Sequence, residues 1–198
     1  MKKKSNYTFI VLLVFFIVIA VFSLIHFISS ENSHIATNAS DSFLLAENLS
    51  CVRAYNDTVF GVSMTGIVEN GANVTVLAGY YHCNPLKRGD IIVYNYSGNK
   101  NPLIKIVKGI AGDSFSLQKT TGGAILLINN ISQKTSTGSP YLLDDGRYQL
   151  LQLYVRDFAG VIPKNSALIL GNNPAGTIDS SYFGLVSVND IIGKALVN

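Results

Sequence analysis

The stretch Leu103-Ile104-Lys105-Ile106-Val107 places a single lysine inside an apolar β-strand, and the turn residues Gly109-Ile110-Ala111-Gly112-Asp113 follow it. From Cys51 onward the chain repeats this pattern, with apolar runs of four to seven residues between Gly, Asn, Asp and Pro. No long stretch places apolar residues at helical spacing. We therefore expect an all-β domain over residues 51–198, with strands at residues 74–78, 91–96, 103–107, 114–118, 124–128, 148–155, 167–170 and 191–196.

Two segments between the expected strands have the composition of turns or loops. Asn129-Asn130 lies between two short apolar runs, and this pattern favours the tight turn of a β-hairpin. Residues 134–147 are rich in Ser, Thr, Gly and Asp, which is typical of a loop or an insertion.

The N-terminal segment differs from the rest of the chain in hydropathy. Residues 9–28 carry no charged side chain, and these twenty positions are enough for a helix to cross a bilayer. The alternative is a cleaved secretory signal, whose apolar core is normally shorter, about 7–15 residues. We expect a cytoplasmic basic tail at residues 1–8, a transmembrane helix at residues 9–28, a juxtamembrane spacer at residues 29–50 and an extracytoplasmic domain at residues 51–198.

The charge distribution supports this topology and excludes one class of partner. The 12 basic and 12 acidic side chains beyond residue 30 balance, so the net charge of +3 comes from Lys2, Lys3 and Lys4. A lysine run before the apolar segment predicts a cytoplasmic N-terminus and a single pass through the plasma membrane. A neutral domain has no electrostatic attraction to nucleic acid, and we expect no nucleic-acid partner.

The cysteines and histidines indicate no metal site. They have no spacing typical of metal ligands, and we expect neither a metal nor a cofactor. Cys51 and Cys83 both lie in the expected extracytoplasmic part, where an oxidising compartment permits a disulfide. The sequence leaves open whether they form one or remain two separate thiols.

Ser63 and Lys105 have the residue types of a nucleophile and a general base. A lone serine is a weak indication, and a strand lysine faces either solvent or the interior. In the interior, burial disfavours the charged amine and lowers its pKa from about 10.4 towards the value of about 7–8 that a general base needs. A neutral Lys105 amine would accept the hydroxyl proton of Ser63 as the oxygen attacks a carbonyl.

Four short motifs, in order behind the apolar N-terminal run, resemble those of type I signal peptidases. The family's Ser-Met-x-Pro-Thr-Leu corresponds to Ser63-Met64-Thr65-Gly66-Ile67-Val68, and its Gly-Asp-Ile-Val to Gly89-Asp90-Ile91-Ile92-Val93. Its lysine motif corresponds to residues 105–113. Its last motif, Gly-Asp-Asn followed by Ser-x-Asp-Ser-Arg, corresponds to Gly171-Asn172-Asn173 and Thr177-Ile178-Asp179-Ser180-Ser181. The resemblance implies a membrane-anchored β-fold serine peptidase that removes signal peptides from exported preproteins.

The resemblance also implies roles for individual residues. Ser63 matches the nucleophile, and its backbone N–H matches an oxyanion-hole donor. Lys105 matches the general base, while Lys108 does not, because positions three apart on a strand face opposite sides. Thr177 matches a serine whose hydroxyl orients the lysine. Some members have a second oxyanion-hole serine two positions before the nucleophile, where this chain has Gly61.

The chain departs from the family pattern at several positions. Gly66-Ile67-Val68 replaces Pro-Thr-Leu, Asn172 replaces an aspartate, and Ser181 replaces an arginine that the family pairs with the residue matching Asp179. These departures indicate a divergent member. The alternative is a catalytically silent membrane-anchored β-domain that binds partners, although Ser63 and Lys105 are both retained.

A signal peptidase would bind an extended preprotein segment by adding it to a sheet edge, with small side chains at two alternate positions. We expect the segments 62–65 and 92–96 to flank this substrate, and Ile67, Val68 and neighbouring apolar residues to contact the lipid surface. A self-cleaving repressor-type Ser-Lys protease is a second enzymatic alternative. That class lacks a membrane anchor and usually carries a DNA-binding domain.

Overall fold

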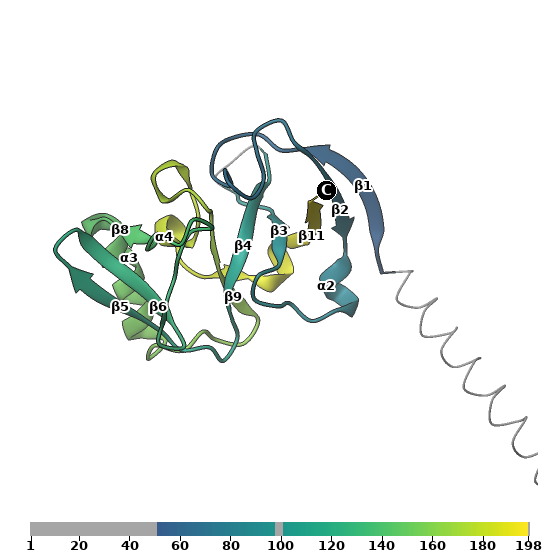
Figure 1. Ribbon diagram of the computed structural model, residues 1–198. Helices are drawn as coiled ribbons and strands as arrows, with labels where there is room; N and C mark the ends of the chain where they lie inside the picture. Colours follow the sequence, from purple (N-terminus) through teal and green to yellow (C-terminus); the bar gives the residue numbers. More distant parts are fainter. Residues whose placement is uncertain (1–50, 98–100, 198) are drawn as a thin grey trace, which may run out of the picture. The chain divides into compact units, whose positions relative to one another are not determined.

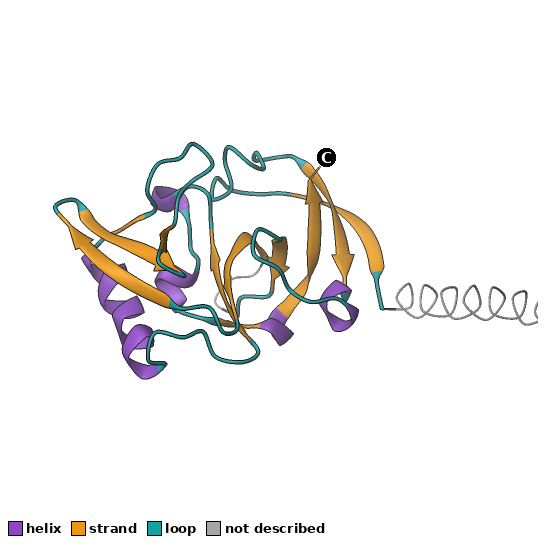
Figure 2. Cartoon of the chain, turned by 60° about the horizontal axis from the view of Figure 1, so that its bottom comes forward, coloured by secondary structure: helices purple, strands orange, loops and turns teal. Residues whose placement is uncertain are grey.

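The computed structural model describes residues 51–97 and 101–197, which belong to one compact unit that begins at Cys51. Strands outnumber helices in this domain, and long loops connect them (Figure 2). The expected cytoplasmic tail, transmembrane helix and spacer fall outside the described residues. Within the described ranges, no helix combines the length and hydropathy needed to cross a bilayer.

The described domain contains two antiparallel sheets (Figure 1). The larger sheet has seven strands, which in spatial order are β1 (Arg53–Thr58), β2 (Asn73–Ala78), β11 (Ile191–Val197), β3 (Ile91–Tyr94), β4 (Leu103–Ile110), β9 (Ser166–Leu170) and β10 (Val186–Ser187). In the smaller sheet, β6 (Gly123–Ile128) pairs with β5 (Phe115–Thr120), β7 (Ile131–Ser132) and β8 (Leu142–Leu143). The helical elements are α2 (Tyr80–Cys83), α3 (Asp145–Asp157), α4 (Ser180–Phe183) and two 3₁₀ turns, η1 (Pro174–Gly176) and η2 (Val188–Asp190).

Seven of the eight expected strands coincide with β2, β3, β4, β5, β6, β9 and β11, with ends that differ by a few residues. The expected hairpin turn at Asn129-Asn130 also forms. Its two residues have φ values of 49° and 63°, as a two-residue turn between antiparallel strands requires. Ile128 and Ile131, on either side of the turn, are paired.

The strand expected at residues 148–155 is wrong, because this segment lies within helix α3, and the domain is therefore mostly β rather than all-β. The Asp144 carboxylate caps the helix by accepting the Arg147 N–H at 2.9 Å. Leu151 is fully buried, and Tyr148 and Val155, three residues before and four after it, are half-buried. This spacing is helical, and the high strand propensity of tyrosine and valine conceals it.

Strand β1 has no counterpart among the expected strands. Its residues are mostly polar, and five of the six are exposed, because it is an edge strand that pairs only with β2. Backbone hydrogen bonds to β2 hold this strand in place, and its side chains do not alternate between buried and exposed positions. Cys51, just before β1, forms a disulfide with Cys83 at the end of α2. This pairing encloses β1, the Ser63 segment and β2 in one covalent loop.

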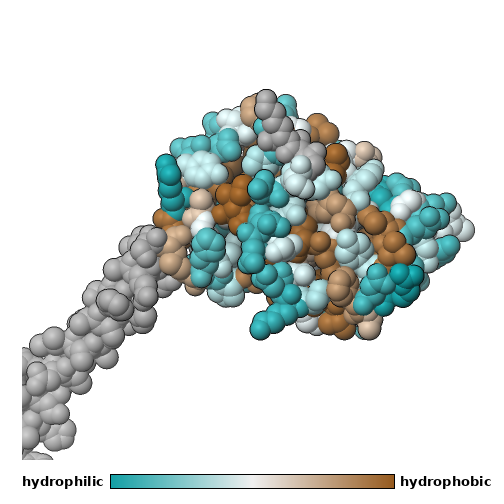
Figure 3. Space-filling model, turned by 180° about the vertical axis from the view of Figure 1, so that it is seen from behind, coloured by the Kyte–Doolittle hydropathy of each residue, from teal (hydrophilic) through white to brown (hydrophobic). Residues whose placement is uncertain are grey.

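The interior is divided into three apolar clusters. One lies between the smaller sheet and α3 and contains Phe115, Leu126 and Leu151. Another lies beneath the connection between β1 and β2 and contains Met64, Val76 and Ile106. On the face seen in Figure 3, hydrophobic side chains reach the surface in separate groups between hydrophilic ones.

Candidate active site

Ser63 lies in the turn that connects β1 to β2. The Thr65 N–H donates to the Val62 carbonyl at 3.3 Å and the Ile67 N–H to the Met64 carbonyl at 3.0 Å. Met64 is only 1% exposed, and burial of such a side chain contributes about 1.5–3 kcal/mol to stability. The turn is thus anchored by Met64 directly beside Ser63.

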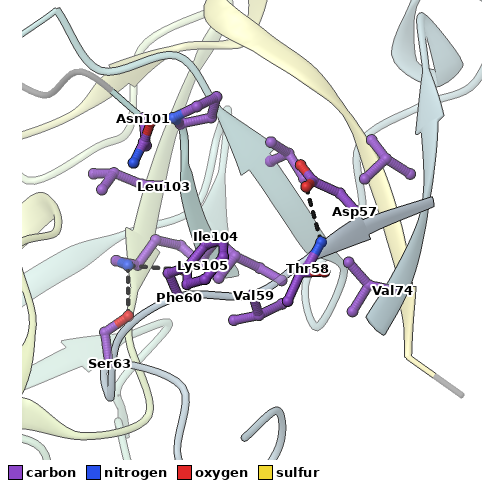
Figure 4. Close-up of a pocket in the computed structure, with 13 residues that line it drawn as sticks. Asp57, Thr58, Val59, Phe60, Ser63, Val74, Asn101, Leu103, Ile104 and Lys105 are labelled. Atoms are coloured by element: carbon purple, nitrogen blue, oxygen red, sulfur yellow. Dashed lines mark hydrogen bonds between the residues drawn. The ribbon is translucent and has the colours of Figure 1, made fainter. Parts of the chain in front are cut away.

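Lys105 extends from β4 towards Ser63 (Figure 4). It is paired across the sheet with Ile92 on β3, and it is 2% exposed. Its Nζ lies 2.9 Å from Ser63 Oγ and donates to the Ile104 carbonyl at 2.7 Å. The structure therefore brings a buried amine and a hydroxyl, 42 residues apart in the chain, into hydrogen-bond contact.

The environment of Lys105 lowers the pKa of its amine. Burial lowers the pKa of Lys105 to about 8, although the nearby charge of Asp179 acts in the opposite direction. An amine with this pKa is partly deprotonated near neutral pH. It has the basicity that proton transfer from a serine hydroxyl requires.

Thr177 is buried at 5% exposure, and its hydroxyl donates to Asp179 Oδ2 at 3.1 Å. No hydrogen bond joins Thr177 to Lys105 among the described residues. Because the threonine proton is directed at Asp179, the hydroxyl lone pairs remain available as acceptors. Thr177 is therefore oriented by Asp179.

Asp179 is fully buried and accepts five hydrogen bonds. Its Oδ2 accepts from the Tyr141 hydroxyl at 2.5 Å, the Gly171 N–H at 2.8 Å and Thr177. Its Oδ1 accepts from the N–H and the hydroxyl of Ser181, at 2.9 and 2.7 Å. These donors satisfy a carboxylate that would otherwise be costly to bury.

Within the described residues, the backbone carbonyl of Ser63 is hydrogen-bonded, whereas its backbone N–H is not. Its carbonyl accepts from the N–H groups of Asn172 and Asn173, at 2.7 and 3.0 Å. Its own N–H has no hydrogen-bond partner within residues 51–97 and 101–197. A free N–H beside a serine hydroxyl is suited to stabilise an oxyanion.

A cleft of about 270 Å³ opens beside the pair, between residues 57–60 and residues 101–105. Val59, Val74, Val76 and Val93 contribute to its walls. β4 pairs with β3 from Leu103 onward, but its pairing with β9 begins only at Ile106. On the β9 side, residues 103–105 therefore have no strand partner in the described part of the chain, and this edge borders the cleft.

Lys108 lies apart from this cleft. It lines a different cavity, together with Arg88 and Asn129, and its Nζ donates to the Lys134 carbonyl at 3.3 Å. Burial also lowers the pKa of Lys108, so a lowered pKa by itself does not distinguish the two lysines. The two lysines differ in their contacts, because among the described residues Lys105, unlike Lys108, forms a hydrogen bond with a serine hydroxyl.

Two sequence expectations about the surroundings of Ser63 are wrong in part. Residues 92–94 cannot pair with a substrate strand, because β3 already lies between β11 and β4. Val68 is 2% exposed and the half-buried Ile67 packs against the same apolar cluster, so both side chains contribute to the core. The exposed apolar residues near Ser63 are instead Phe60 and Val62, at 77% and 53% exposure.

The acidic residues of the second and third motifs hold elements of the domain together. The Asp90 carboxylate accepts from Lys194 Nζ at 2.6 Å and from the Tyr81 hydroxyl at 3.0 Å. Asp113 is paired with Arg88. Among the described residues, no group of three or more Cys, His, Asp and Glu side chains could hold a metal ion.

Comparison with known proteins identifies the family. The family described as "Signal peptidase, peptidase S26" matches residues 5–198. The chain belongs to the signal peptidase family, peptidase S26. It is 30% identical to signal peptidase IB of Staphylococcus aureus (strain COL), over 69% of this chain and 73% of that protein. It is 31% identical to signal peptidase I of Bacillus caldolyticus, over 70% of this chain and 75% of that protein.

Among solved structures, a signal peptidase I from Enterococcus faecalis V583 matches with 22% identity and a TM-score of 0.41. The match covers 56% of this chain and 97% of that one.

Within the signal peptidase framework, the structure shows site neighbours that the motifs do not reveal. Tyr141 and Ser136 lie in the segment that the sequence indicates as a loop or insertion, yet they contact Asp179 and Asn172, both in the last motif. No local pattern marks either residue. Their partners are more than 30 residues away in the chain.

Proposed function

We propose that this member of the signal peptidase family is a membrane-anchored serine endopeptidase that removes N-terminal signal peptides from exported preproteins. Ser63 is the nucleophile and Lys105 the general base. The observation that carries the proposal is the 2.9 Å contact between Ser63 Oγ and Lys105 Nζ. It is supported by burial that lowers the pKa of the amine to about 8.

In the proposed reaction, neutral Lys105 takes the Ser63 hydroxyl proton as the oxygen attacks the scissile carbonyl. The Ser63 N–H stabilises the resulting oxyanion. Protonated Lys105 then gives the proton to the leaving amine, and water hydrolyses the acyl-enzyme. Thr177 orients Lys105, because its hydroxyl donates to Asp179 and so presents lone pairs that an ammonium group needs.

The preprotein is proposed to bind as an extended strand along the unpaired edge of residues 103–105. A cleft of about 270 Å³ with valine in its walls suits small side chains, in accord with a small-x-small cleavage site. Residues 62–65 would lie on the other side of the scissile bond, next to Ser63. No metal or nucleotide takes part in the proposed reaction.

Residues 9–28 are proposed to anchor the enzyme in the plasma membrane, with the N-terminus in the cytoplasm and the peptidase domain outside. The signal peptide of a preprotein is itself apolar and reaches the site from the bilayer. Phe60 and Val62, both exposed beside Ser63, would contact that apolar segment or the lipid surface.

The proposal is tested with the full chain in detergent or vesicles and a model preprotein with an Ala-x-Ala cleavage site. Ser63→Ala and Lys105→Ala, each separately, are expected to abolish cleavage, with residual rates lower by at least about 10³-fold. Lys108→Ala is the matched control and is expected to cleave like the wild type. If both site variants retain wild-type cleavage, the Ser-Lys assignment is wrong. If the wild type cleaves no preprotein, the silent binding domain is the better interpretation.

A further inference from the structure

Two departures from the signal peptidase motifs are in contact with each other. Gly66 occupies the position of the family's proline, and its φ of +88° is inaccessible to proline, whose φ is near −65°. A Cβ on Gly66 would lie 3.0 Å from Ser136 Oγ and 3.1 Å from Asn172 Nδ2. The turn after Ser63 therefore has a different backbone from the family pattern, and the space above it is filled by two polar side chains.

The Asn172 side chain connects three segments that are distant in sequence. Its Nδ2 donates to the Thr65 carbonyl and to Ser136 Oγ, both at 2.7 Å. Its Oδ1 accepts the Ser136 N–H at 2.7 Å, and the residue is only 6% exposed. We call Asn172 and Ser136 together the amide clamp.

The amide clamp acts on the turn that carries the nucleophile. The Asn172 N–H donates to the Ser63 carbonyl while its side chain donates to Thr65. Met64, between these two anchored carbonyls, is buried. Two successive points of the turn are thus fixed around the backbone N–H and hydroxyl of Ser63.

The chemistry of the clamp requires an amide. An ionised aspartate, the family residue at this position, accepts hydrogen bonds but donates none. It would place a negative oxygen against the Thr65 carbonyl and remove the donor to Ser136. Asn172 therefore donates hydrogen bonds to the turn that contains Gly66 and to Ser136, which an ionised carboxylate at this position could not do.

We propose that the amide clamp positions Ser63, in place of the rigidity that proline gives the family's turn. Asn172 and Ser136 are positioning residues, which act through the backbone around Ser63. The consequence for cleavage rests on the proposed peptidase function, whereas the effect on the turn itself does not.

The first test measures kcat and KM for the model preprotein, at a temperature at which each variant is folded. Asn172→Asp restores the family residue and is expected to lower kcat by about 10–100-fold, because small misplacements of a reacting group are costly. Ser136→Ala is expected to lower kcat by about 3–10-fold. KM should stay within about twofold for both variants. Ser139→Ala is the matched control, because its hydroxyl contacts only Thr137 in the same loop.

A double variant tests whether the two residues act as one unit. With Asn172→Asp already present, adding Ser136→Ala should cost less than about twofold more in kcat, since the Nδ2 donor that joins the Ser136 hydroxyl to the turn is already lost. If the loss of kcat in the double variant equals the product of the losses in the two single variants, Asn172 and Ser136 act independently and the clamp is not a unit.

Amide hydrogen exchange gives a readout that does not depend on cleavage. The Asn172 and Asn173 N–H groups donate to the Ser63 carbonyl, and their protection should fall at least about tenfold in Asn172→Asp and Ser136→Ala but not in Ser139→Ala. If the wild type cleaves nothing but protection falls as expected, the peptidase proposal fails and the clamp stands. Unchanged protection, or unchanged kcat in an active enzyme, overturns the clamp.

Discussion

The Tyr141 hydroxyl donates a 2.5 Å hydrogen bond to the buried carboxylate of Asp179. In the family motif the corresponding aspartate is paired with an arginine, and here Ser181 stands in its place. Tyr141 and Ser181 supply hydrogen bonds without supplying a positive charge. The negative charge of Asp179 therefore acts on Lys105 without a cation at position 181.

Tyr141→Phe is expected to lower the free energy of unfolding by about 1–3 kcal/mol, because it removes one donor from a buried carboxylate. Burial raises the pKa of Tyr141, so the donor stays protonated over the working pH range. Urea unfolding at pH 7 measures the effect. Tyr182→Phe is the control, since Tyr182 is 52% exposed. Equal stability of the two variants would contradict the role of Tyr141.

Cleavage by the wild type is expected to increase with pH, and the rising part of the kcat/KM profile, here called its limb, should have its midpoint near pH 8. Lys105 must be neutral to accept the Ser63 proton, and burial lowers its pKa to about 8. Asp179 raises this pKa, so Asp179→Asn should move the limb to lower pH even if the rate falls. A pH–rate profile of both proteins measures the shift. A limb that moves upward would exclude Asp179 as a charge acting on Lys105.

Lys105→Met is expected to abolish cleavage and to stabilise the domain. In the wild type, the pKa of Lys105 is about 8 when folded and about 10.4 when unfolded. Below pH 8 both states are protonated and the cost of burying the charge is fully present. It decreases as the pH rises from 8 to 10.4, because the unfolded state then binds more protons.

The expected gain from Lys105→Met is therefore roughly 1–3 kcal/mol at pH 7, and it should shrink towards pH 10. Urea unfolding at the two pH values measures it. Lys164→Met, at an exposed position, controls for removal of a lysine charge. A variant less stable than the wild type at pH 7 would show that the Lys105 ammonium is stabilised in the fold.

Reduction of the Cys51–Cys83 disulfide is expected to lower the free energy of unfolding by about 2–4 kcal/mol, since the bridge closes a loop of moderate length. Thermal unfolding of the wild type with and without reductant measures this. Cys83→Ser should unfold like the reduced wild type and should not respond to reductant. If reductant leaves the wild-type Tm unchanged, the bridge does not form or does not stabilise the domain.

Seven strands of the two sheets were predictable from sequence, because side-chain alternation and turn residues are local signals. β4 and the Asn129-Asn130 turn are examples. Helix α3 was mistaken for a strand because Tyr148 and Val155 favour strands, and only packing of Leu151 against the smaller sheet shows its helical spacing. Edge strand β1 was missed because it is held by backbone hydrogen bonds to β2, which leave no pattern in its side chains.

The sequence by itself determined the order of the motifs, the family and the choice of Ser63 and Lys105 as candidates, because each depends on residues close together in the chain. The tertiary structure decided how these candidates are supported. It placed Tyr141 on Asp179, 38 residues away, and Asn172 on Thr65, 107 residues away. Such hydrogen bonds depend on how distant segments pack, and no local pattern of residues encodes them.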